Sequence, residues 1–152
     1  MATETSTTGR VAEILALMKK GDDAFNDHDF EAMHAVHHPD MVAHIVGSEE
    51  SIRGADAHRA AMEGMISAFP DVHVENDPYP LQFGQGDWLT VITKATGTFA
   101  GDLVTPDGSV IPPTGKSFAL NFSTTARWEG ELLIEEYVFW DTALQAQQIG
   151  LA

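Results

Sequence analysis

Two kinds of residue are scarce in this sequence: cysteine is absent, and basic residues are few. The 152 residues include 8 lysines and arginines against 23 aspartates and glutamates, which gives a formal net charge of −15. Without cysteine the chain has no disulfide, no thiolate metal ligand and no cysteine nucleophile. The acidic excess repels phosphate backbones and anionic lipids, so we expect neither nucleic acid nor a membrane surface as a partner.

Long apolar runs are also missing. No stretch approaches the ~20 apolar residues that cross a bilayer, and residues 1–9 lack the basic and apolar segments of a signal peptide. We therefore expect a cytoplasmic protein. Its length favours a single domain over residues 9–152, preceded by a disordered tail at residues 1–8.

Apolar residues follow a helical period early in the chain and alternate later. The helical spacing predicts helices over about 10–26, 30–36 and 56–69, with a short strand at 41–46 between them. From residue 72 the pattern predicts strands, the longest at 88–99, 117–128 and 132–140, a loop at 101–115 and a final helix at 142–149. Helices followed by an antiparallel meander indicate an α+β fold, with the helices on one face of a strongly curved sheet.

Three groups of motifs occur in a fixed order along the chain. They are AFPD at 68–71, then GTFAG at 97–101 followed by PTG at 113–115, then EEYVFWD at 135–141 followed by QIG at 148–150. In this order they resemble the SnoaL-like polyketide cyclases and their ester-cyclase relatives, within the nuclear-transport-factor-like superfamily. The resemblance extends over nearly the whole chain from Val11.

The resemblance implies a cone-shaped fold, in which a curved mixed or antiparallel sheet carries the N-terminal helices on its concave face. It also implies a pocket between sheet and helices, no cofactor, and an intramolecular aldol closure with an aspartate on the last strand as acid/base. Asp141 matches that aspartate. The GTFAG motif departs from the family, which often carries histidine where this chain has Phe99.

Asp141 is the first candidate catalytic residue. Strand alternation places it on one face with Phe139, Tyr137 and Glu135. Among aromatic rings a carboxylate loses hydration and its pKa rises, so it can exchange a proton near neutral pH. The alternative interpretation is an N-cap, because Asp141 directly precedes the last predicted helix.

The neighbours of Asp141 depend on the turn at Glu129-Gly130, and the sequence leaves two registers open. A two-residue hairpin places apolar side chains on its face, namely Phe118, Leu120 and Phe122. A three-residue loop places polar side chains there instead, namely Arg127, Thr125, Ser123 and Asn121.

His44 and Tyr137 are the other candidate catalytic residues. His44 alternates with Val42 and Val46, so it can point into the cone as a second acid/base, or it can be a hydrogen-bonded core histidine. Tyr137 can donate a hydrogen bond to an enolate, or pack as an aromatic side chain. We expect the substrate pocket to include Glu135, Phe139, Phe99, Phe25, Trp88, Asn121 and Arg127.

A run of histidines follows the second predicted helix: His34, His37, His38 and His44, with Asp40 among them. Within it His34 and His38 have helical i, i+4 spacing, and Pro39 ends the helix just beyond them. Surface histidines around a turn explain this pattern, so we expect no metal site.

These observations together predict a cofactor-independent cyclase that acts by aldol-type acid/base chemistry on a small apolar carbonyl or polyketide-like substrate. A ketosteroid-isomerase-like isomerase or a hydrolase could use the same pocket, and a non-catalytic binding or dimerisation module is the third alternative. Apolar residues on the uncovered sheet face predict a homodimer or a dimer of dimers, and those expected there are Leu132, Ile134, Val138 and Trp140.

Overall fold

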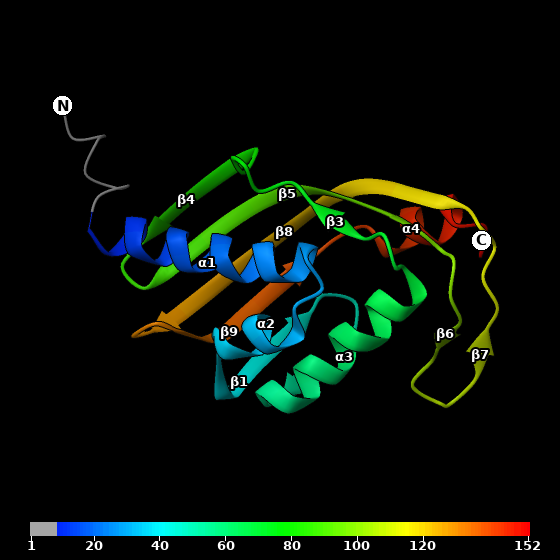
Figure 1. The fold of residues 1–152 in the computed structure, drawn as a ribbon, viewed down its shortest axis with the longest axis horizontal. Helices are drawn as coiled ribbons and strands as arrows, with labels where there is room; N and C mark the ends of the chain where they lie inside the picture. Colours follow the sequence, from blue (N-terminus) through cyan, green and yellow to red (C-terminus); the bar gives the residue numbers. More distant parts are fainter. Residues whose placement is uncertain (1–8) are drawn as a thin grey trace.

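Nine strands and four helices make up residues 9–152, the part of the chain that the computed structural model describes (Figure 1). The helices are α1 (Arg10–Asn26), α2 (Phe30–Ala35), α3 (Ala55–Ala68) and α4 (Thr142–Gln148). The strands are β1 (His37–Ile45), β2 (Ile52–Arg53), β3 (His73–Val74), β4 (Leu81–Gln85), β5 (Trp88–Thr98), β6 (Leu103–Val104), β7 (Val110–Ile111), β8 (Ser117–Glu129) and β9 (Leu132–Phe139). The predicted tail at residues 1–8 lies outside the described residues.

A curved mixed sheet contains seven of the strands described for residues 9–152. Its order is β2-β1-β9-β8-β5-β3, and β4 also pairs with β5. β1 runs parallel to β9, whereas every other pair in this sheet is antiparallel. β5 pairs with β8 along its whole length, from Trp88 opposite Arg127 to Thr98 opposite Ser117.

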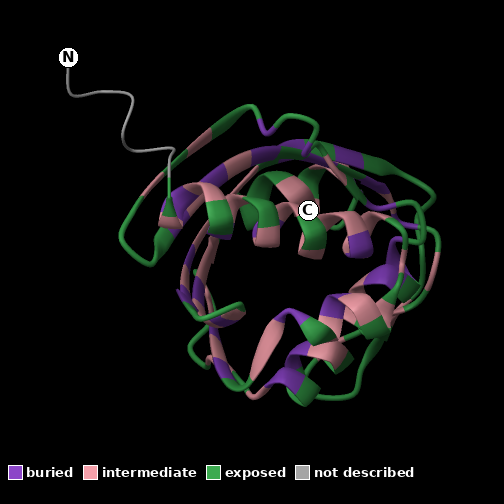
Figure 2. Cartoon of the chain, turned by 60° about the vertical axis from the view of Figure 1, so that its left-hand side comes forward, coloured by how far each residue is buried: buried purple, intermediate pink, exposed green. Residues whose placement is uncertain are grey.

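Helices α1, α2 and α3 lie on the concave side of this sheet, which curves around them (Figures 1 and 2). α1 buries Val11, Ile14 and Met18, which recur every three or four residues and so form one apolar stripe. Asp29 begins α2, because its carboxylate accepts a hydrogen bond from the Ala32 backbone N–H at 3.0 Å. The predicted α+β fold, with helices on the concave face of a curved sheet, is confirmed.

Two segments differ from the sequence prediction. β1 begins at His37 rather than at residue 41, because the chain pairs His37 with Leu133 of β9 as soon as α2 has ended. The ladder is irregular between His37 and Val42, and such a bulge accommodates Pro39, which has no N–H to donate. The predicted loop at 101–115 contains the paired strands β6 and β7.

The buried apolar side chains form two clusters. One contains Ile14, Met41 and Trp128, and the other contains Phe69 and Phe118 together with their neighbours. Within residues 9–152, no helix is both long and apolar enough to cross a membrane.

Candidate active site in the interior cavity

A cavity of about 730 Å³ lies between the concave face of the sheet and the helices. Its wall is mostly apolar, and its aromatic lining residues are Phe25, Phe69, Phe118, Phe122, Trp128 and Trp140. Its titratable lining residues are Asp22, His37, His58, Asp102 and Glu136. A concave, mostly apolar space of this size with a few polar groups has the character of a small-molecule site.

Glu136 and His58 form a buried pair at this cavity. Glu136 lies on β9 and His58 near the start of α3, and their side chains are 10% and 9% exposed. His58 Nε2 lies 3.1 Å from Glu136 Oε1. Burial opposes ionisation of Glu136, but the hydrogen bond from His58 and the proximity of both histidines outweigh it and hold the pKa of Glu136 below its usual value.

His37 completes this group from the start of β1. Its ring centroid lies 4.4 Å from that of His58. His37 Nδ1 lies 2.8 Å from the Met33 carbonyl oxygen, which can only accept, so Nδ1 carries the hydrogen. Burial, with the nearby His58, lowers the pKa of His37 to about 4, so His37 is neutral near pH 7.

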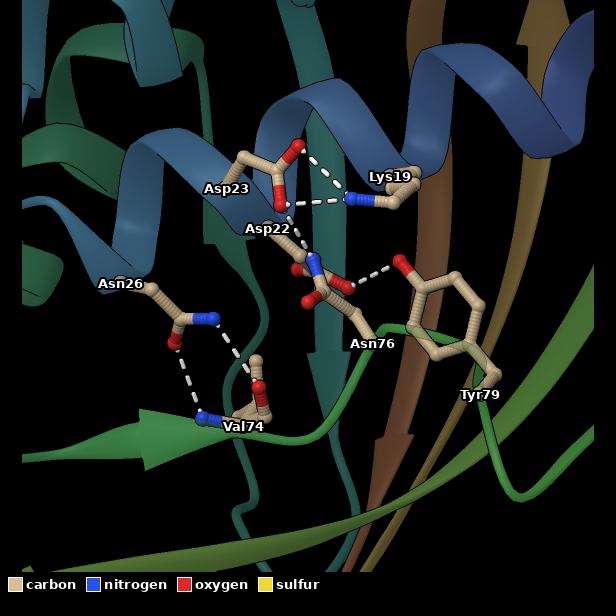
Figure 3. A network of polar contacts seen from close by, with 7 residues as sticks. All are labelled: Lys19, Asp22, Asp23, Asn26, Val74, Asn76 and Tyr79. Carbon is tan, nitrogen blue, oxygen red and sulfur yellow. Dashed lines mark hydrogen bonds and ion pairs between the residues drawn. The ribbon is translucent and has the colours of Figure 1, made fainter.

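Asp22 faces the same cavity from α1. The Tyr79 hydroxyl donates a hydrogen bond to Asp22 Oδ2 at 2.6 Å (Figure 3). Burial raises the pKa of Asp22 to about 7; the hydrogen bond from Tyr79 opposes this rise, and the charge of Glu136 adds to it. Asp22 is therefore a carboxylic acid in a large fraction of molecules near neutral pH.

The adjacent carboxylate, Asp23, behaves in the opposite way. Lys19 Nζ and the Asn76 amide both donate hydrogen bonds to it, at 3.0 and 2.8 Å (Figure 3). Burial acts to raise the pKa of Asp23, but these two hydrogen bonds outweigh it and hold the pKa below its usual value. Asp22 and Asp23 therefore carry protons over different pH ranges, although they are neighbours in α1.

The structure places Asp141 away from this cavity. Its Oδ1 accepts a hydrogen bond from the Leu144 backbone N–H at 2.8 Å, so Asp141 is the exposed N-cap of α4. The geometry matches the capping interpretation and not the pocket placement that alternation suggested. After the irregularity in β9, Glu136 and Val138 line the cavity, as does Trp140 just after the strand, whereas Glu135, Tyr137 and Phe139 do not. Leu133, which precedes the irregularity, also lines the cavity.

The turn between β8 and β9 explains this choice of face. Gly130 and Glu131 form a two-residue turn, and an irregularity follows it, so that Arg127 pairs with Glu135 and Thr125 with Tyr137. Arg127, Thr125 and Ser123, the polar neighbours predicted for a three-residue loop, therefore lie opposite odd-numbered residues of β9. They lie on the outer face of the sheet and not in the cavity. The expectation that Val138 and Trp140 lie on that outer face is corrected at the same time, because both line the cavity.

On the outer face the structure brings several predicted site residues together. His44 contacts Ser51 Oγ through Nδ1 at 2.8 Å and Glu135 Oε2 through Nε2 at 3.2 Å. Tyr137 stacks on the His44 ring at a centroid distance of 4.4 Å. Arg127 lies 3.6 Å from Glu135 and also sits over the ring of Trp88. None of these side chains lines the described cavity.

The remaining predicted pocket residues lie in three different places: at the cavity, in the core and on the surface. Phe25 lines the cavity. Phe99 is fully buried in the core against Phe69, outside the cavity wall. Asn121 and Phe139 are exposed and do not line the cavity. The reason is the same alternation, since both belong to the outward set of β8 and β9.

Sequence reasoning missed Asp22, His58 and Glu136. A usable signal was present, because Asp22 lies four residues after Met18 and three before Phe25, on the apolar stripe of α1. His58 interrupts the buried stripe of α3 in the same way. A polar residue on an otherwise apolar helix face identifies a side chain that points inward and needs an explanation.

The comparison with known families agrees with this architecture. The sequence matches the family described as SnoaL-like polyketide cyclase over residues 16–149, and the chain therefore belongs to this family. No curated protein sequence matches it significantly.

Solved structures share the fold at low sequence identity. AclR from Streptomyces galilaeus, described as a candidate hydroxylase, has a TM-score of 0.77 and 20% identity, over 95% of this chain and 84% of its own. A SnoaL-like protein from Jannaschia sp. CCS1, described as a candidate polyketide cyclase, has a TM-score of 0.77 and 18% identity, over 100% of this chain and 98% of its own. IdmH from Streptomyces antibioticus, also described as a candidate polyketide cyclase, has a TM-score of 0.71 and 21% identity, over 89% of this chain and 96% of its own.

Proposed function

We propose that this protein is an enzyme that moves protons on an enolisable carbonyl compound held in the interior cavity, with Asp22 as the acid and the Glu136–His58 pair as the base. One observation carries the proposal: two carboxyl groups with opposite protonation preferences line the same apolar cavity. Pairs of titratable groups whose surroundings push their pKa values apart suit acid/base chemistry. Membership of the SnoaL-like family supports a cyclase-type or isomerase-type reaction.

The proposed reaction needs no group beyond these side chains. Glu136, oriented by His58, removes a proton from the carbon next to the substrate carbonyl. Asp22 gives its proton to the carbonyl oxygen as the enol forms, and the Tyr79 hydroxyl then stabilises the resulting Asp22 carboxylate. In a cyclisation the enol carbon attacks a second carbonyl of the same molecule, whose oxygen takes the proton held by Glu136, while the enol hydroxyl returns its proton to Asp22. In an isomerisation the enol is a conjugated dienol, whose far carbon takes the proton held by Glu136 while the enol hydroxyl returns its proton to Asp22.

The wall of the cavity supports a largely apolar substrate. Its aromatic side chains offer contact surface, whereas the polar groups that can fix a carbonyl are few. A non-catalytic ligand-binding module remains the alternative from another class, and the capping role of Asp141 accords with it. The positions of Asp22 and Glu136 favour the enzyme over a module that binds an apolar ligand, because such a ligand does not offset the cost of burying two carboxyl groups.

The test compares three conservative variants in one assay. Deuterium exchange at the carbon next to a carbonyl, followed by NMR over a panel of enolisable ketones and polyketide-like esters, reports proton removal directly. We expect Asp22→Asn and Glu136→Gln each to lower the rate by roughly 10²–10⁴ while remaining folded.

Asp141→Asn distinguishes the catalytic groups proposed from the structure, Asp22 and Glu136, from the candidate that the sequence suggested, Asp141. Asparagine caps a helix about as well as aspartate, so this variant keeps the N-cap and removes the charge. We expect it to exchange at the parent rate. A loss of rate in Asp141→Asn, with Asp22→Asn and Glu136→Gln unaffected, would return the catalytic role to Asp141 and refute the proposal.

A further inference from the structure

Three metal-ligating side chains converge at the cavity, although they lie far apart in the sequence. His37, His58 and Glu136 each offer one ligand atom, and these atoms all lie within 4.8 Å of one another. They belong to β1, α3 and β9, so three separate elements hold them in place. The histidine run expected to lie on the surface does not form this group, since among its members His37 alone takes part.

The spacing is close to what a transition-metal ion requires. Ligand atoms at ~2.0–2.1 Å from a tetrahedral ion lie about 3.3 Å from one another. His58 Nε2 and Glu136 Oε1 are already 3.1 Å apart. Closing the longest separation in the group needs a shift of roughly 1–1.5 Å, which is within the reach of side-chain rotation.

The hydrogen bonding of His37 favours ligation. Because the Met33 carbonyl oxygen accepts from Nδ1, the lone pair of the ring lies on Nε2. Metal-binding histidines usually donate their other ring N–H to a backbone carbonyl or a carboxylate, which fixes the ring and its tautomer. His37 already has this second contact in place.

The charge of the group also suits a cation. Among the ion pairs of residues 9–152, Glu136 takes part in its pair with His58 and in none with lysine or arginine. Its carboxylate is therefore free to compensate a metal charge. Asp22 lines the same cavity and can contribute a further negative charge.

We infer that His37, His58 and Glu136 form a three-ligand site for a divalent transition-metal ion whose open coordination position faces the cavity. Two imidazoles and one carboxylate suit zinc, cobalt, nickel or ferrous iron, whereas calcium and magnesium prefer oxygen ligands throughout. All three residues line the cavity, so a fourth position is open to water or to a ligand. The ion takes the place of the proton between His58 and Glu136, so it competes with the base of the proposed function.

Metal binding is tested directly, without substrate. Purified full-length protein is stripped with a chelator, dialysed, and titrated with zinc chloride by isothermal titration calorimetry, and cobalt chloride is followed by its visible absorption. We expect one ion per chain in the parent. His37→Gln, His58→Gln and Glu136→Gln should each weaken binding at least tenfold, because each removes one ligand.

His38→Gln is the matched control, since His38 adjoins His37 but is not part of the group. It should bind zinc as the parent does. Circular dichroism identifies any variant that fails to fold. The result is decided by those of the three ligand variants, His37→Gln, His58→Gln and Glu136→Gln, that do fold. No zinc binding in the parent, or equal affinity in the parent and in a folded ligand variant, would overturn the site. Exchange activity measured with the chelator present tests the proposed function separately.

Discussion

Replacing Asp22 with asparagine gives a quantitative test of the unusual carboxyl group in the cavity. The folded protein holds the proton on Asp22 more tightly than the unfolded chain does, because its pKa is raised from 3.8 to about 7. Its contribution to stability is therefore complete below pH about 4 and is lost as the pH rises through about 7. Asparagine mimics the neutral acid, and its side-chain oxygen can still accept from Tyr79.

The size of the effect follows from the two pKa values. At about 1.4 kcal/mol for each tenfold change in proton affinity, full ionisation of Asp22 lowers the free energy of unfolding by at most about 4 kcal/mol. Asp22 borders a cavity that can hold water, and this solvent screens part of the cost. Because the parent loses stability throughout the interval between the two pKa values, we expect Asp22→Asn to be more stable than the parent by roughly 1 kcal/mol at pH 5 and by roughly 2–3 kcal/mol at pH 8.

Urea unfolding at pH 5, 6, 7 and 8, followed by circular dichroism, measures this difference. Asp23→Asn is the control, because the pKa of Asp23 is held below its usual value and its charge is stabilised by Lys19. That variant should gain no stability at pH 8. A difference between Asp22→Asn and the parent that stays constant from pH 5 to pH 8 would show that Asp22 titrates normally, and the proposed acid would lose its basis.

Two further predictions concern catalysis and assembly. If Asp22 acts as the acid, kcat/KM for proton exchange should fall above pH about 7 as Asp22 ionises; a rate that keeps rising to pH 9 contradicts this role. We also propose that two copies associate through the outer sheet face, where Phe83 and Phe139 are 58% and 44% exposed. Light scattering at micromolar concentration should give a dimer or larger assembly for the parent and a monomer for Phe139→Glu, and a monomeric parent would contradict the proposal.

The sequence alone was sufficient for the fold and for the family. Apolar residues at helical spacing located α1 and α3, and alternation located β5, β8 and β9 almost to the residue. These signals are local, since each depends on side chains within one element. The ordered motifs from Ala68 to Gly150 pointed to the SnoaL-like family, which the family match confirms.

Which side chains form the site depends on contacts between separate elements, and a sequence pattern within one element does not show these contacts. Alternation showed that Glu135 and Glu136 lie on opposite faces of one strand, but it did not show which face is covered by helices. The two-residue turn at Gly130 and the irregularity after it set the register, which pairs Glu136 with Ala126 and Glu135 with Arg127 of β8.

The residues that contact Glu136 are also determined by tertiary structure, because they come from other elements. His58 comes from α3 and His37 from the start of β1, and the parallel pairing of β1 with β9 brings that strand beside Glu136. Asp141, the motif residue that sequence favoured, caps α4 and does not line the cavity. Sequence determined which elements form and which residues share a face, because both follow from the geometry of one segment. Only the packing of helices against the curved sheet determined which face encloses the cavity, and hence which carboxylates lose water and change their pKa.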